Sequence, residues 1–200
     1  VPASPTVSLT GELYNPARLP DSSTYYNRLW LPGKVRLQTG ETAHNVYLRY
    51  SKLTDDLFWF EPHNRITVRL DKEPVTGFHF MSVDGDTSVS FRRIKIKTLL
   101  VADSVSVFAE EIHRGRISLY VRRGCEPDRQ ELITQKGSTY LVSHYRDLPS
   151  YVVKTSAGRM VAIAGLRKKD LVSLSPENKD RIRKYLNQNR QLAAGRKKDL

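Results

Sequence analysis

Short runs of alternating apolar and polar residues, separated by turn-forming residues, recur through most of this sequence. In "NVYLRYS" the side chains of Val46, Leu48 and Tyr50 share one face, and "RITVRL" repeats the pattern. A period of two is typical of half-buried β-strands. About a dozen such runs lie between Lys34 and Ala164. The pattern predicts a mainly β fold with an antiparallel sheet, arranged as a curved sheet, a barrel or a sandwich.

The composition of the chain changes twice and predicts three parts. Residues 1–32 form an extended proline-rich N-terminal arm, because closely spaced prolines prevent a long helix. Residues 33–165 form the antiparallel β domain. Within it Asp84-Gly85 predicts a hairpin turn, and the polar run "GCEPDRQ" predicts a loop. Residues 166–200 form a C-terminal helical appendage with a basic tail.

The appendage is the one part of the sequence with a helix start signal. The residues "SPE" at 175–177 provide an N-cap serine, a proline at the first helical position and an acidic residue in the first turn. They predict a basic α-helix near Pro176–Gln188. A narrow apolar stripe predicts the surface by which this helix docks: Ile182, Tyr185 and Leu186.

Positive charge is concentrated near the C-terminus. The chain has a net charge of +12, and eleven basic and four acidic residues lie between Arg167 and Leu200. One hypothesis is therefore a nucleic-acid-binding protein that uses the basic tail together with one strand face. The candidate phosphate contacts are Arg93, Lys95, Lys97, Lys168 and Lys169.

Few residues are placed for catalysis. The segment "TDDLFWFEPH" brings four acid–base groups close together in sequence, and a hydrolase is a second alternative on that basis. These groups are Asp55, Asp56, Glu61 and His63. The five histidines lack metal-binding spacing, and no phosphate-binding glycine loop or dinucleotide fingerprint is present. We therefore expect no metal, no cofactor and no enzymatic turnover.

The first residues suggest a compartment. The chain starts at Val1, so it is either a fragment or a processed form, and "VPASPTVSL" fits the segment that follows a cleaved signal peptide. No run approaches the roughly 18 apolar residues that a membrane span needs. Cys125 is the one cysteine, which excludes an intramolecular disulfide. The expectation is an exported chain without a transmembrane span.

Two long stretches carry a resemblance to a known group. The first, at 14–60, joins an aromatic–Trp–x–x–Gly–x–Val segment to "LRYSKLTDDLF", and the second, at 140–189, leads from a final hairpin through "LRKKDLVSLSPENKDRIRKYLNQN". Together they resemble uncharacterised exported β-rich cell-envelope proteins of the Bacteroidota type. After Asn189 that group predicts another helix, whereas "RQLAAGRKKDL" is short and broken by glycine.

The resemblance implies export to the periplasm or the outer membrane and brings no catalytic residues with it. Combined with the missing catalytic motifs, it predicts a non-enzymatic binding or assembly module of the bacterial cell envelope. Such a module would be a subunit or accessory of a larger periplasmic or outer-membrane assembly. Its expected partner is an envelope protein.

Overall fold

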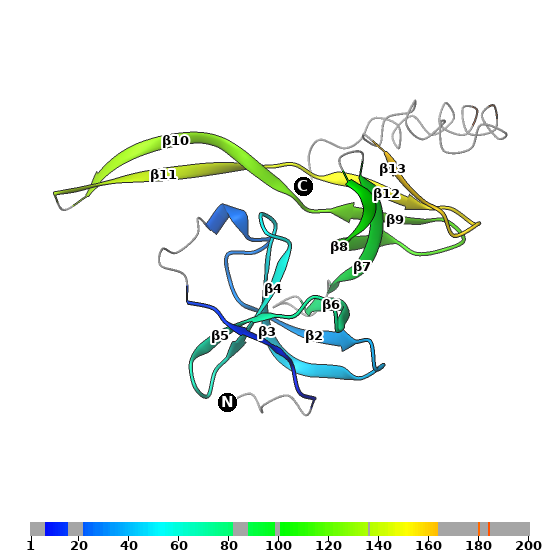
Figure 1. Ribbon diagram of the computed structural model, residues 1–200, viewed down its shortest axis with the longest axis horizontal. Coiled ribbons are helices and arrows are strands. Elements are labelled where there is room, and N and C mark those ends of the chain that lie inside the picture. Colours follow the sequence, from blue (N-terminus) through cyan, green and yellow to red (C-terminus); the bar gives the residue numbers. More distant parts are fainter. Residues whose placement is uncertain are drawn as a thin grey trace. The chain divides into compact units, whose positions relative to one another are not determined.

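The computed structural model describes residues 7–15, 22–81, 88–98, 101–135 and 137–163, together with Asp180 and Lys184. The described chain is mainly β, as predicted (Figure 1). It divides into two compact units, which we describe separately. The first comprises Val1–Glu111 and Arg122–Pro149, and the second comprises Ile112–Val121 and Ser150–Leu200.

The first unit is built around an antiparallel sheet. The order of its strands is β1-β5-β4-β3-β2-β6-β7-β8, so β2 pairs with its sequence neighbour β3 on one side and with β6 on the other. These described strands do not close into a barrel. One 3₁₀ turn, η1 (Ser22–Thr24), precedes the second strand. The strands are β1 (Gly11–Leu13), β2 (Leu31–Leu37), β3 (Thr42–Ser51), β4 (Asp56–Glu61), β5 (Ile66–Leu70), β6 (Val75–Met81), β7 (Ser88–Thr98) and β8 (Val101–His113).

The core of this unit lies against one face of the sheet. Val46, Leu48 and Tyr50 of β3 are all buried, which confirms the face that the alternation predicted. Aromatic rings fill much of the space, and the rings of Phe78 and Phe91 stack with their centroids 4.6 Å apart. Large buried side chains of this kind contribute about 1.5–3 kcal/mol each. The core therefore holds β2, β3, β6 and β7 firmly in register.

The N-terminal segment is attached to the same unit. Its strand β1 pairs with β5, and the Tyr26 amide donates to the Tyr50 carbonyl. The ring of Tyr26 packs 5.7 Å from that of Phe80. Strand β2 begins at Leu31 and follows this segment directly. The boundary of an N-terminal arm at residue 32 stays a prediction.

Two further strands of the first unit form a separate two-stranded sheet. β10 (Cys125–Gln135) and β11 (Ser138–Asp147) pair along their whole length, and we call them the β10–β11 ribbon (Figure 1). The prediction of a loop at "GCEPDRQ" is therefore wrong from Cys125 onward. The polar residues gave no alternating pattern because neither face of the ribbon is buried in a core.

The second unit contains β9 (Ser118–Arg122) up to Val121, together with β12 (Ser150–Lys154) and β13 (Met160–Ile163). Strands β12 and β13 form a tight antiparallel hairpin, and Gly158 adopts a φ of 79° in its turn. Asp180 and Lys184, within the predicted C-terminal helix, are helical and exposed. The rest of that helix and the Asp84-Gly85 turn lie outside the described residues, so both stay predictions.

Candidate functional site

The β10–β11 ribbon exposes large apolar side chains on both of its faces. Its register places Leu132 opposite Leu141 on one face, and Ile133 opposite Tyr140 on the other. Their exposed fractions are 70%, 52%, 39% and 52%, respectively. We call these four side chains the ribbon patch. Grouped apolar exposure of this kind is typical of surfaces that contact other molecules.

Polar contacts hold the ribbon together and fix its base. Arg146 Nε donates to Glu126 Oε1 at 2.8 Å, and His144 Nε2 lies 3.2 Å from Glu131 Oε2. At the base, Lys52, which directly follows β3, forms an ion pair with Asp147. A two-stranded hairpin is marginally stable in water by itself. The ribbon therefore gains from any surface that covers its apolar side chains.

The charge of the ribbon differs from that of the whole chain. Cys125–Asp147 contains four acidic and three basic residues, a net charge of −1, while the complete chain carries +12. A mixed, nearly neutral surface with exposed Leu, Ile and Tyr resembles the composition of protein–protein contacts. It lacks the excess of cations that attracts anionic membranes or nucleic acids.

The carboxylate of Asp55, predicted as a candidate acid or base, is a structural anchor. It accepts hydrogen bonds from Tyr50 Oη at 2.7 Å, from Lys72 Nζ at 2.8 Å and from the Phe108 amide at 3.1 Å. Asp55 itself is 6% exposed and has a φ of 58°. Burial, followed by the charge of Asp55, raises the pKa of Tyr50. The group therefore ties β3 to β8.

The other three predicted acid–base residues do not join Asp55 in a pocket. Glu61 accepts hydrogen bonds from the amides of Asn64 at 2.6 Å and His63 at 2.9 Å, which shapes the turn after β4. The Asn64 amide, the leading cause, lowers the pKa of Glu61. Asp56 is half-buried at the start of β4. None of the four lines the pocket that β2, β6 and β7 form on the first unit.

The predicted phosphate contacts and docking residues are placed only in part. Arg93 Nη1 donates to the Lys72 carbonyl and to Glu73 Oε2, both at 3.0 Å, whereas Lys95 is exposed. The side chain of Lys97 lies outside the described residues. So do Lys168 and Lys169, as well as Ile182, Tyr185 and Leu186. Both assignments stay predictions.

A cationic pocket on the first unit was not predicted from the sequence. Strands β2, β6 and β7 line it with Lys34, Arg36, His79, Ser90 and Arg92, around a space of about 240 Å³. These residues are up to 58 positions apart in the chain, and only the strand register brings them together. In the sequence these residues alternate with the core residues Val35, Phe78, Phe80 and Phe91, and that alternation could have placed them on one face of the sheet.

The described residues include no group of three or more His, Cys, Asp or Glu side chains arranged to hold a metal ion. No helix in the described part of the chain has the length and apolar character needed to cross a membrane. Comparison with known proteins finds no family model, no curated protein and no solved structure that matches this chain.

Proposed function

We propose that this protein is a non-enzymatic binding or assembly module of the bacterial cell envelope, acting as a subunit or accessory of a larger periplasmic or outer-membrane assembly. The observation that carries the proposal is the ribbon patch, which exposes Leu132, Ile133, Tyr140 and Leu141 on a two-stranded ribbon. The partner is an envelope protein that covers this patch.

A protein partner suits the ribbon better than a lipid surface or a nucleic acid. Burying an apolar side chain of this size contributes about 1.5–3 kcal/mol, and the ribbon offers four of them on two faces. A partner that covers both faces removes the whole patch from water. The net charge of −1 on the ribbon gives no attraction to anionic lipid headgroups or phosphates.

The envelope location is supported by the resemblance of residues 14–189 to exported β-rich proteins. A role without enzymatic turnover is supported by the structural hydrogen bonds that the Asp55 and Glu61 carboxylates accept. Asp55 anchors buried donors, and Glu61 shapes a turn, so neither is free to exchange protons with a substrate in this arrangement. The proposal thus assigns the chain a binding role.

Sedimentation of native extracts tests the proposal. The envelope fraction of the cells that produce the protein is extracted gently and separated on a gradient, with wild type compared with the double variant Leu132→Ser/Leu141→Ser. We expect wild type in the envelope fraction and in a complex much larger than the free chain. The variant should sediment as the free chain, because it loses one face of the ribbon patch.

The matched control replaces the neighbouring polar pair on the same face, Thr134→Ala/Thr139→Ala. Those hydroxyls are exposed and lie 3.1 Å apart, so they contribute little to any contact beyond the ribbon. The control should sediment with wild type. Sedimentation of wild type as a free chain, or no change in the leucine variant, contradicts the assembly role, and a cytosolic location contradicts the envelope assignment.

A further inference from the structure

Three neighbouring strands of the first unit place cationic side chains around a glycine. Across β2, β6 and β7 the register aligns Arg36, Gly77 and Arg92 in one row. The next row contains Lys34, His79 and Ser90. All of these residues lie on the sheet face opposite the buried side chains of Val35, Phe78 and Phe91.

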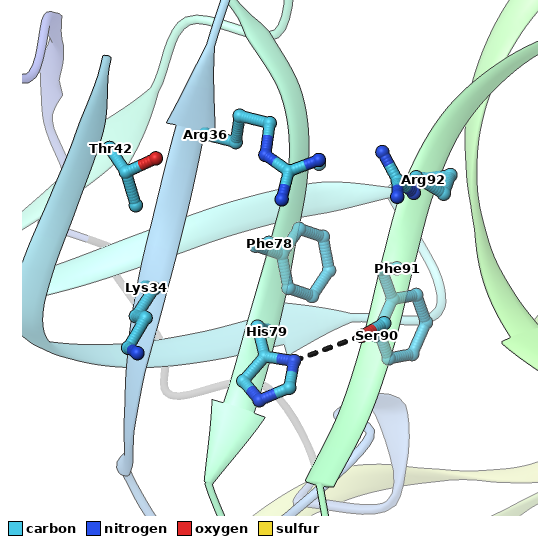
Figure 2. A pocket seen from close by; sticks show the side chains of 9 residues that line it. Lys34, Arg36, Thr42, Phe78, His79, Ser90, Phe91 and Arg92 are labelled. Carbon is cyan, nitrogen blue, oxygen red and sulfur yellow. Dashed lines mark hydrogen bonds between the residues drawn. The ribbon is translucent and has the colours of Figure 1, made fainter. Parts of the chain in front are cut away.

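Gly77 makes the space between the two arginines. A Cβ at this position would lie 2.5 Å from the Phe91 carbonyl oxygen, so no larger residue fits without a shift of the backbone. Strand spacing separates the Arg36 and Arg92 backbones by about 10 Å. Figure 2 shows the Arg36 guanidinium extending across β6 toward that of Arg92. The two groups can thus converge above the bare backbone of Gly77.

The charges of the pocket are only partly compensated. Arg92 Nε lies 3.4 Å from Glu111 Oε2, a long contact through one of its donors. Within the described residues, Lys34 and Arg36 have no acidic partner within ion-pair distance. Three cations therefore face one carboxylate, and the pocket carries a net positive charge.

His79 adds a polar group to the floor of the pocket. Its Nδ1 lies 2.9 Å from Ser90 Oγ, and Figure 2 shows this pair beside the arginine row. Burial, followed by the charge of Lys34, lowers the pKa of His79 and so favours the neutral ring. The contact with Ser90 fixes the orientation of the ring through Nδ1, and Nε2 lies on the opposite side of the imidazole.

We propose that this pocket binds a phosphate group, carried either by a small soluble molecule or by a lipid headgroup. Guanidinium groups present paired N–H donors that match the oxygens of a phosphate, and Arg36 and Arg92 approach from opposite sides. The space of about 240 Å³ is below the roughly 300–1,000 Å³ of pockets for drug-sized ligands, which suits a small head group.

A nucleic acid fits the pocket less well. Single strands are held by exposed aromatic rings on which the bases stack. The two rings beside this pocket, Phe78 and Phe91, point into the core and are 3% and 1% exposed. The pocket therefore offers phosphate contacts without a surface for bases.

Binding of inorganic phosphate, measured by titration calorimetry on the full chain, tests the site. We expect Arg36→Gln to weaken binding about 10- to 100-fold, as the loss of a charge-assisted contact does. The affinity of Arg36→Lys should fall between those of wild type and Arg36→Gln, because lysine keeps the charge and loses the paired donors. Arg28→Gln is the matched control: it removes an exposed arginine of the first unit that lies outside the pocket, and it should bind phosphate like wild type.

The source of the phosphate is distinguished by a second probe, vesicles of phosphatidylcholine with or without phosphatidic acid. Arg36-dependent binding of inorganic phosphate supports a soluble ligand, and Arg36-dependent binding of the phosphatidic acid vesicles alone supports a lipid headgroup. The proposal is overturned if neither probe binds, or if Arg36→Gln and Arg28→Gln behave alike. Tighter, Arg36-dependent binding of a single-stranded oligonucleotide would overturn it in favour of a nucleic acid.

Discussion

Replacement of Asp55 by alanine should destabilise the first unit strongly. The substitution leaves two buried donors, Tyr50 Oη and the Phe108 amide, without their acceptor. Each unsatisfied buried group costs about 1–3 kcal/mol. Alanine at a left-handed backbone position adds about 1–2 kcal/mol. Lys72 is partly exposed and can reach water, so the loss of its ion pair with Asp55 adds little. We expect the free energy of unfolding to fall by about 3–8 kcal/mol.

Urea unfolding followed by tryptophan fluorescence measures this effect. Trp30 and Trp59 are the two tryptophans of the chain, and both belong to the first unit, so the signal reports the unit that contains Asp55. Asp55→Gly removes the backbone penalty and should recover about 1–2 kcal/mol relative to alanine. Tyr50→Phe should cost about 1.5–3 kcal/mol, because one hydrogen bond to a charged group is lost.

Asp56→Ala is the matched control for this series. It removes a carboxylate one position along the chain from a half-buried site that makes none of the buried contacts of Asp55. We expect a change within about 0.5 kcal/mol. If Asp55→Ala costs less than about 1 kcal/mol, or no more than Asp56→Ala, the carboxylate is not the anchor that its contacts indicate.

Four further outcomes follow from the first unit. Gly77→Ala should lower the free energy of unfolding by about 1–3 kcal/mol in urea, since its Cβ would press on the Phe91 carbonyl. Burial, with Tyr14 nearby, raises the pKa of Tyr25 to about 12. The difference between the ultraviolet titrations of wild type and Tyr25→Phe should therefore show ionisation near that pH. The stability linked to this shift should be present below pH 10 and lost as the pH rises through 12. An NMR titration should place the pKa of His79 below 6.5 and show it rising when phosphate is added, because the bound anion opposes the effects of burial and Lys34. Burial raises the pKa of Cys125, so the folded protein should react with a thiol reagent more slowly than the protein unfolded in urea. An unshifted pKa at Tyr25, an unshifted pKa at His79, or equal thiol reaction rates would each contradict the corresponding assignment.

The sequence was most informative where one strand face is buried. Alternation in β3 placed Val46, Leu48 and Tyr50 on the core side, and the structure confirms it. The pattern reports burial, so it identified strands by their contact with the core. It could not identify β10, which has Leu132 and Ile133 exposed on opposite faces and therefore no alternation to detect.

The chemistry of single residues was harder to predict because it depends on pairing between distant strands. Asp55 lies beside the acidic residue Asp56 in the sequence, yet its partner Phe108 is 53 positions away. Arg36, Gly77 and Arg92 meet only because β6 pairs with both β2 and β7 in one register. A shift of one residue in either pairing would turn one arginine toward the core.

Site-specific photo-crosslinking at the ribbon tests the assembly role most directly. A photoreactive side chain in place of Leu141 is activated in the cells that produce the protein, with the same group in place of Leu53 as an exposed apolar control in the first unit outside the ribbon. We predict one discrete crosslinked species at Leu141, none at Leu53, and loss of the species when Leu132→Ser is added. No crosslink at Leu141, or equal crosslinking at Leu53, would contradict a partner on the ribbon.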